Sequence, residues 1–422
     1  MKYFYSLALL AISHFSFSQT DFNTIYTKAR ESYKSKDYKT FYTLASSAAQ
    51  LRPTHQGAQY FAGIAAALNS KPEEAVAHLK QSILIDTRYD LANPDLASLK
   101  ERPDFKELVL LQAEINSPII HSDTALVIRD RQLHAEGIAY NPDSKIFYLG
   151  SIHQRKIVQV DTKGYSTDFI KTSLPEMASI FGLKLDRKRK FLWACSSALP
   201  ETKNYNETIA SKVYKFDLAG NLIGVFDPPA DVKGAIFGDL VLTGNDEVYV
   251  SDSKNNLILK VNESTKKLDK FFESSEFLNL QGITFTDDNS IMFIADYLGN
   301  IFKLEMKARR LTKISCTLDV SVKGIDGLSF YKGSLIAIQN GVAPLRVVQF
   351  FLNKEYTSIS EFKTIDRNHP AFNEPTLGTI DKNILYYIAN SQWSGYNDDH
   401  TIKPFEQLQD IVILKVDLGK LK

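Results

Sequence analysis

The spacing of apolar residues changes once along the chain. Between residues 21 and 116 they recur at steps of three and four, which is typical of amphipathic helices. Pro53 ends the first helical run, and Pro72 opens a later one, where the N–H that proline lacks would have no partner. From about residue 118 onward apolar and polar residues alternate, as in half-buried strands. The pattern predicts a helical domain over 19–117 and a β domain over 118–422.

Two segments of the helical part repeat one pattern. ARESYKSKDYKTFYTLASSAAQLRP and FAGIAAALNSKPEEAVAHLKQSILID each have the form helix–turn–helix at about tetratricopeptide length. The following DLANPDLASLKERPDFKELV is similar to the closing repeat of such arrays. The alternative interpretation is a plain helical hairpin that caps the next domain.

The β part repeats a unit of about 45 residues. Each unit begins with a small or polar residue, which we call its lead. An apolar strand, a turn, a second strand and a third strand follow. The first strands are EGIAY at 136, FGLKLD at 181, GDLVLT at 238, QGITFT at 281, DGLSFY at 326 and PTLGTI at 375. This repeat predicts a six-bladed β-propeller. The segment SDTALVIRD at 122–130 is placed to supply the outer strand that the last blade lacks.

Composition limits the classes of partner. The chain has 422 residues, and 50 Lys and Arg against 49 Asp and Glu leave a net charge of +1, so no basic excess exists to hold nucleic acid. Its two cysteines, Cys195 and Cys316, are too few for a disulfide framework; a bridge is the alternative to two free thiols.

The first residues, MKYFYSLALLAISHFSFSQ, predict a signal peptide over 1–18 that is cleaved before Gln19. No later run of about 20 apolar residues exists, so no membrane span is expected. We therefore expect a secreted or periplasmic protein.

The strand order places candidate chemistry at one end of the propeller. In an antiparallel sheet the first strand starts on the face where the second strand ends, so the leads of all blades gather at one tunnel mouth. Two long insertions, 197–211 and 391–410, also leave from this face, and function concentrates in such loops. Asp252 and Asp296 repeat in one motif position and are expected to bond backbone in turns.

Four leads carry oxygen ligands of the kind that Ca²⁺ takes, and these predict a divalent metal site; the alternative is hydrogen bonding to backbone. The predicted metal ligands are Glu136, Asp239, Gln281 and Asp326. Near the same face, His153 is a candidate acid/base group, and the alternative for it is an ordinary loop residue. Trp393 would stack on a flat ligand or pack in a lid. The predicted substrate contacts are His134, Arg155, Asn340, Asn390 and Trp393.

Four segments resemble the gluconolactonase / senescence-marker-protein family of six-bladed propellers: HAEGIAYNPDSKIFYLGS, FGDLVLTGNDEVYVSDS, LQGITFTDDNSIMFIADY and GIDGLSFYKGSLIAIQNG. The resemblance covers about 130 to 418 and implies a central divalent metal held by a Glu, two Asn and an Asp. The Glu and the Asp match Glu136 and Asp326, whereas the two Asn positions fall at Gly238, next to Asp239, and at Gln281. It also implies a lactone substrate, with Asp326 as base or ligand.

Three hypotheses follow, of which the third is a strictosidine-synthase-like fold that carries out another condensation or hydrolysis. The first is an exported, metal-dependent, lactonase-like hydrolase with its site at the tunnel mouth. The second is a non-catalytic propeller that binds a small molecule or a protein, with the helical repeats as a second docking surface. The sequence contains no G-x-S-x-G, H-E-x-x-H or phosphate-loop motif that would favour another class of enzyme.

Overall fold

The computed structural model describes residues 17–421, and it describes side chains from residue 21. Nearly all of the predicted signal peptide thus lies outside the described residues. Contacts within the chain divide the described residues into two units: residues up to Ile83 with Tyr89–Val109, and Leu84–Arg88 with the residues from Leu110 onward. None of the described helices is long and apolar enough to cross a membrane.

The first unit is built from helices. In chain order the helices are α1 (Phe17–Lys34), α2 (Tyr38–Leu51), α3 (Gln56–Leu68), α4 (Pro72–Ile85), the 3-10 turn η1 (Pro94–Leu99) and α5 (Pro103–Asn116). The Asp37 carboxylate caps α2 by accepting the N–H of Thr40 at 3.1 Å. Buried alanines let the helices approach closely, and Phe41 meets Phe61 edge-on at 6.0 Å. The predicted end of a helix before Pro53 and the predicted start of a helix at Pro72 are confirmed.

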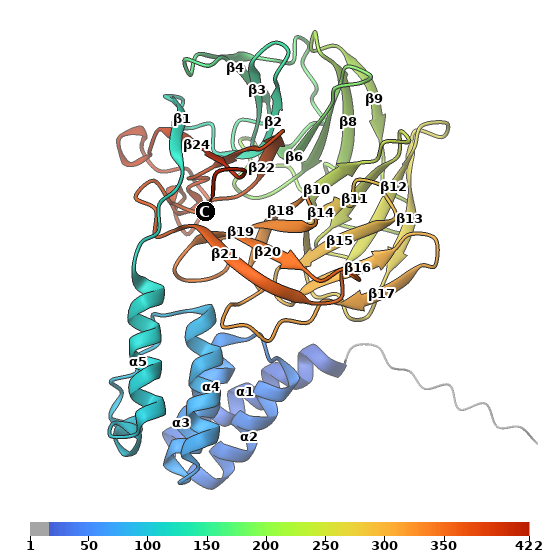
Figure 1. Cartoon of the computed structure of the whole chain (residues 1–422). Coiled ribbons are helices and arrows are strands. Elements are labelled where there is room, and N and C mark those ends of the chain that lie inside the picture. The colour runs from blue at the N-terminus through green and yellow to red at the C-terminus, as the bar shows by residue number, and fades with distance from the viewer. Residues whose placement is uncertain (1–16, 422) are drawn as a thin grey trace, which may run out of the picture. The chain divides into compact units, whose positions relative to one another are not determined.

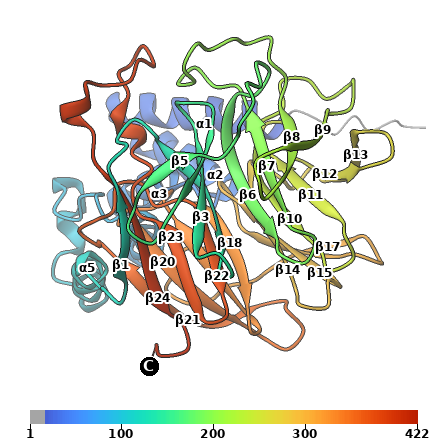
Figure 2. The ribbon, with the colours of Figure 1, turned by 90° about the horizontal axis from the view of Figure 1, so that it is seen from above.

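The second unit contains six four-stranded antiparallel sheets around a common centre (Figures 1 and 2). From the innermost strand outward, the first three sheets are β2–β5 (Ala135–Asn141, Ile146–Ser151, Ile157–Val160, Ser166–Asp168), β6–β9 (Ser179–Asp186, Phe191–Ser197, Lys212–Asp217, Leu222–Phe226) and β10–β13 (Phe237–Leu242, Val248–Asp252, Leu257–Asn262, Lys267–Glu273). The next two are β14–β17 (Leu280–Phe285, Ile291–Asp296, Ile301–Glu305, Arg310–Lys313) and β18–β21 (Ile325–Tyr331, Ser334–Gln339, Arg346–Leu352, Ile359–Arg367). The predicted six-bladed propeller is confirmed.

The last sheet closes the ring with a strand from the start of the β unit. Strands β22 (Gly378–Asp381), β23 (Ile384–Ile388) and β24 (Ile411–Asp417) are completed on the outside by β1 (Asp123–Ile128), which pairs antiparallel with β24. The Asp366 carboxylate accepts hydrogen bonds from the backbone N–H groups of His121 and Ser122, just ahead of β1. The closure predicted from SDTALVIRD is therefore confirmed.

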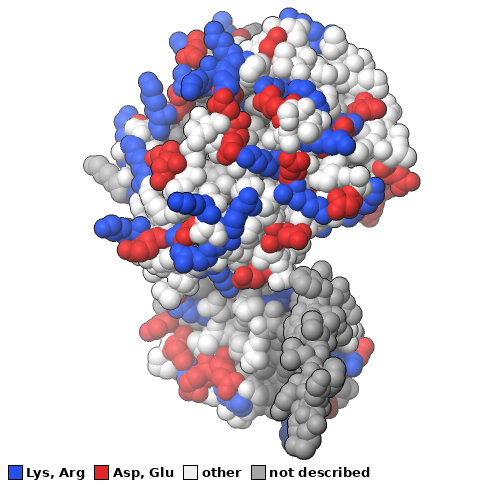
Figure 3. All heavy atoms as spheres, turned by 90° about the vertical axis from the view of Figure 1, so that its right-hand side faces the viewer, with Lys and Arg blue, Asp and Glu red and all other residues white. Residues whose placement is uncertain are grey.

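A cluster of buried apolar side chains lies between each pair of neighbouring sheets. This burial holds the blades together, because the apolar face of each sheet is removed from water by packing on the neighbouring sheet. On the propeller face shown in Figure 3, basic and acidic side chains are intermixed, in keeping with the balanced composition. Cys195 and Cys316 are free thiols.

Candidate functional site

The leads of the inner strands lie in β-bulges. In five sheets the register between the first and second strand shifts just where the lead stands; between Ala135 and Ile138, for example, two residues face one residue of β3. A bulge leaves its extra residue outside the ladder and redirects its side chain. The leads placed in this way are Glu136, Phe181, Gly238 with Asp239, Gln281 and Asp326.

Glycines beside the leads bring neighbouring blades together. A Cβ on each of these glycines would collide with the lead segment of the next blade; the pairs are Gly137 with Phe181, Gly182 with Asp239, Gly238 with Gln281, Gly282 with Asp326, and Gly327 with Thr376. Thr376 then donates a hydrogen bond to Glu136, which closes the circle from the sixth blade to the first. The leads therefore form one ring at one mouth of the tunnel, and Glu136 and Asp326 lie at the same end.

One hydroxyl group joins the two carboxyl groups that the family resemblance singles out. The Oγ1 of Thr376 lies 2.9 Å from Glu136 Oε1 and 2.9 Å from Asp326 Oδ2. Ser391 donates to the other oxygen of Glu136, and Asn340 Nδ2 donates to Asp326 Oδ2 at 2.7 Å. Because Thr376 has a single hydroxyl proton, it cannot donate to both carboxylates at once. One of the two carboxyl groups must carry a proton for every contact to be a hydrogen bond.

The surroundings of the pair favour this shared proton. Burial and the negative charge of Asp326 raise the pKa of Glu136 to about 8. Burial raises the pKa of Asp326 to about 6, although its hydrogen bonds from Thr376 and Asn340 oppose the rise. Glu136 is 6% exposed, whereas Asp326 is only half-buried. Around neutral pH the pair therefore holds one proton, on the more deeply buried Glu136, and Asp326 is ionised.

Several oxygen acceptors near the pair lack a hydrogen-bond donor. Asn340 Oδ1, Glu374 Oε2 and Asp239 Oδ2 are buried, and no described group donates to them. Burial raises the pKa of Glu374, and the Glu374 charge in turn helps to raise the pKa values of Glu136 and Asp326. Sequence reasoning missed Glu374 because it stands ahead of the lead Thr376, in a backbone conformation with φ of 61° that no sequence pattern signals. The wall thus offers acceptors to a ligand that carries donors.

Two of the four positions of the implied metal site, Gly238 and Gln281, do not carry the expected Asn. Gly238 has no side chain. The amide oxygen of Gln281 lies 2.6 Å from where a Cβ of Gly238 would be, so the Gln281 side chain fills that space. Asp239 instead forms an ion pair with Lys184 at 3.1 Å. Among residues 17–421 no three His, Cys, Asp or Glu side chains converge as ligands of one metal ion. Calcium binding stays a prediction, and the chemistry below is derived from the chain's own groups.

His134 lies in an aromatic cluster under the second inserted loop. It is 1% exposed, its Nδ1 lies 2.5 Å from the Tyr396 hydroxyl, and its ring meets Trp393 edge-on at 4.6 Å. Burial, with a smaller effect of His153, lowers the pKa of His134 to about 3, so the ring is neutral. Burial and the charges of Glu201 and Glu136 raise the pKa of the Tyr396 phenol. Of the predicted substrate contacts, His134 and Trp393 are thus brought together next to Glu136.

Other predicted site residues hold loops in place. The Arg155 guanidinium donates to the carbonyl groups of Met177 and Pro175, and Asn390 is bonded to the backbone of Asp410 and Val412. His153 Nδ1 lies 2.9 Å from the Glu201 carbonyl oxygen, in the first inserted loop. Asp252 and Asp296 accept backbone N–H groups, as expected.

The two inserted loops contact each other over the first blade. His400 Nδ1 lies 2.6 Å from Glu201 Oε1, which connects the loop after β23 to the loop after β7. Ser391 and Tyr396 of the same loop stand over Glu136. The insertions therefore cover the part of the mouth where the proton-sharing pair lies.

Comparison with solved structures gives matches of low sequence identity. A luciferin-regenerating enzyme matches 72% of this chain and 96% of its own at 11% identity with a TM-score of 0.48. An inactive variant of virginiamycin B lyase from Staphylococcus aureus matches 71% and 99% at 13% identity with a TM-score of 0.47. A gluconolactonase from Xanthomonas campestris matches 66% and 85% at 11% identity with a TM-score of 0.45. At these identities the likeness concerns the fold alone. No family model and no curated protein sequence matches the chain.

Proposed function

We propose that the tunnel mouth is the site of a lactonase-like hydrolase in which Asp326 is the general base and Glu136 the general acid. The observation that carries this proposal is the single Thr376 hydroxyl at 2.9 Å from both carboxyl groups. Two carboxyl groups whose surroundings give them different pKa values can divide the roles of acid and base between them. Here the accessible group is ionised and the buried one is protonated near neutral pH.

The chemistry needs only groups that the chain supplies. Asp326 takes a proton from a water molecule as the water oxygen attacks the carbonyl carbon of a cyclic ester. The bond between that carbon and the ring oxygen then breaks, and the departing oxygen takes a proton from the pair, with Thr376 able to pass it on from Glu136. One water molecule is consumed, and the pair again holds one proton. The donor-free oxygens of Asn340 and Glu374 would orient hydroxyl groups of the substrate.

Turnover of a panel of lactones between pH 5 and pH 9 tests this proposal. Asp326→Asn should lower kcat/KM by about 10² to 10⁴, and the wild-type rate should peak between the pKa values of about 6 and about 8. Asp246→Asn, at the opposite end of the propeller, is the control and should leave kcat/KM unchanged. Equal rates for Asp326→Asn and wild type would refute the assignment.

A divalent metal at the same mouth is a separate proposal. A hard cation would bind the deprotonated carboxylates of Glu136 and Asp326 and would polarise a carbonyl group there. Added calcium should then raise the melting temperature of wild type but not of Asp326→Asn, and more strongly at pH 8 than at pH 6, because cation and proton compete. The absence of any shift at either pH would exclude calcium and leave the proton-sharing pair in place.

A binding propeller is the second candidate, favoured by the donor-free oxygens of Asp239, Asn340 and Glu374, which suit recognition as well as catalysis. Its distinguishing result is saturable binding of lactones or their open acids with no turnover by wild type. Export of the protein and docking of a protein partner on the helical repeats stay predictions.

A further inference from the structure

A cavity lies on the face that carries the tunnel mouth. Its volume is about 540 Å³, within the range of small-molecule sites. Its walls are the first inserted loop, the segment 227–236 that joins β9 to β10, and Lys254 after β11. All three segments lie where second strands end and first strands begin. None of the residues that hold the proton-sharing pair lines this cavity.

One wall gathers positive charge. Lys233 and Lys254 both line the cavity, and neither pairs with a carboxylate of the described residues. The Lys254 ammonium lies 3.3 Å from where a Cβ of Gly234 would be, so it crosses directly over this glycine. A side chain at position 234 would displace the ammonium.

The backbone next to the Lys254 ammonium also offers hydrogen-bond donors. The N–H groups of residues 233, 234 and 235 donate no hydrogen bond to any described group. Gly234 has a φ of 57°, and a left-handed residue in such a loop turns successive N–H groups toward one concave side, which is an arrangement that binds anions. The ammonium and the amides therefore act on the same place.

The other charges of the cavity oppose this only in part. The Asp227 carboxylate is already paired with Lys212 at 2.8 Å. Glu207 is exposed and has no cationic partner among the described side chains. Two lysines and one carboxylate without a cationic partner, Glu207, thus line the cavity.

The rest of the lining is apolar. Pro228, Pro229 and Val232 form one side, and Tyr205 stands at the rim with 45% of its surface exposed. A proline surface and a tyrosine ring are suited to a flat apolar group. The cavity thus combines two lysines with an apolar lining.

We propose that this cavity binds a small molecule that carries a carboxylate or phosphate group on a flat apolar body. The anionic group lies between the Lys254 ammonium and the amides of residues 233–235, with Lys233 beside it. The apolar body lies against Pro228 and Tyr205. The proposal is independent of the chemistry at Glu136 and Asp326.

Titration of the full chain with four probes tests it: benzoate, phenyl phosphate, inorganic phosphate and neutral benzyl alcohol, by calorimetry and ligand-observed NMR. Benzoate or phenyl phosphate should bind saturably, and benzyl alcohol should not; the tighter of the two anions identifies the anionic group. Lys254→Ala and Lys233→Ala should each weaken binding by about tenfold, as expected for a charged hydrogen bond.

Three further variants separate a built site from general charge attraction. Glu207→Gln should strengthen anion binding, and Tyr205→Ala should weaken phenyl phosphate while leaving inorganic phosphate unchanged. Lys188→Ala, in the turn at the opposite end of the second blade, should change nothing. Absence of saturable binding by any anion, or an equal loss in Lys188→Ala and Lys254→Ala, would overturn the proposal.

Discussion

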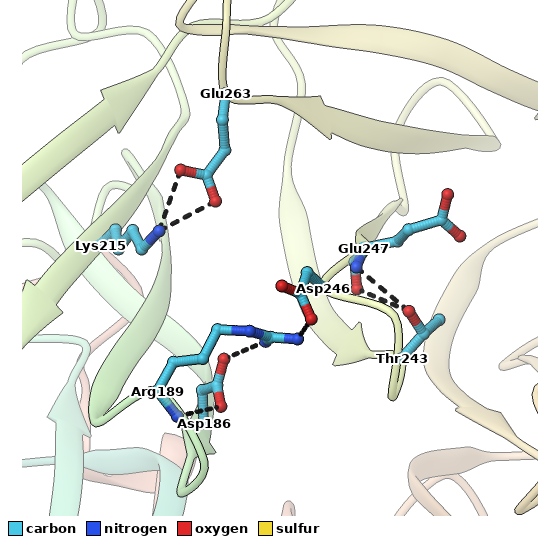
Figure 4. A network of polar contacts seen from close by, with 7 residues as sticks. All are labelled: Asp186, Arg189, Lys215, Thr243, Asp246, Glu247 and Glu263. Atoms are coloured by element: carbon cyan, nitrogen blue, oxygen red, sulfur yellow. Dashed lines mark hydrogen bonds and ion pairs between the residues drawn. The ribbon is translucent and has the colours of Figure 1, made fainter.

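A cluster of charged side chains at one end of the propeller forms ion pairs, whereas Glu136, Asp326 and Glu374 at the other end form none with Lys or Arg among the described residues. At the end away from the mouth, Arg189 pairs with both Asp186 and Asp246, and the Lys215 ammonium lies 2.9 Å from both oxygens of Glu263 (Figure 4). At the mouth, by contrast, no described Lys or Arg forms an ion pair with Glu136, Asp326 or Glu374, and burial raises the pKa of each. Among the four predicted metal ligands, Asp239 has a cationic partner, Lys184.

The pKa directions follow this difference. At the far end, burial would raise the pKa of Glu247, but its bonds with Lys260 and Tyr249 outweigh burial, and the pKa is lowered. At the mouth burial prevails, and the pKa of Glu136 is raised. Paired charges in the first cluster stabilise turns, whereas the unpaired Glu136, Asp326 and Glu374 lower stability and persist where a ligand or a proton can use them. Three predictions test this contrast.

The largest effect is expected from glycines. Gly137→Ala should destabilise the fold by at least about 3 kcal/mol, because the new Cβ would collide with the Phe181 carbonyl oxygen and neither backbone can move without opening the ring. Chemical denaturation measures the loss. Gly244→Ala, in a turn at the far end, is the matched control; its new Cβ meets only Asn289 Nδ2, at 3.4 Å. If both variants lost the same stability, close approach of the leads would not be what shapes the mouth.

Periodicity in the sequence was sufficient to predict the blades, the closing strand and the two insertions, because each depends on local pattern and strand order. The arrangement at the mouth depends on contacts that no local pattern contains. Thr376 and Glu136 are 240 positions apart, and their hydrogen bond forms only when the ring closes. The bulges that redirect the leads, and the Gln281 side chain that fills the space beside Gly238, are likewise results of tertiary packing.

The next effect concerns stability against pH. The unfolded chain releases the Glu136 proton near pH 4.5, whereas the folded chain keeps it until about pH 8. Wild type should therefore lose stability as pH rises between these values, by on the order of 2–3 kcal/mol. Glu136→Gln should remove this loss, and denaturation at pH 5 and pH 8 measures it.

Glu247→Gln at the far end should show the opposite sign. The pKa of Glu247 is lowered in the fold, so its contribution is present above the unfolded pKa and disappears as pH falls. The variant should be less stable than wild type at pH 7 and equal to it in acid. If Glu136→Gln and Glu247→Gln changed the pH profile in the same direction, the contrast between the two ends would be wrong.

The smallest effect concerns acid stability through His134. The unfolded chain protonates this histidine below about pH 6.5, whereas the folded ring stays neutral to about pH 3, so stability should fall by roughly 1–2 kcal/mol between pH 7 and pH 5. His134→Asn suits the backbone, because asparagine tolerates the φ of 45°. At pH 7 the free energy of unfolding of the variant should be about 1 kcal/mol lower than that of wild type, because the hydrogen bond with Tyr396 is lost. Toward pH 5 it should then fall less steeply than that of wild type. If stability fell with pH as steeply in His134→Asn as in wild type, protonation of His134 would not be the cause of the loss of stability in acid.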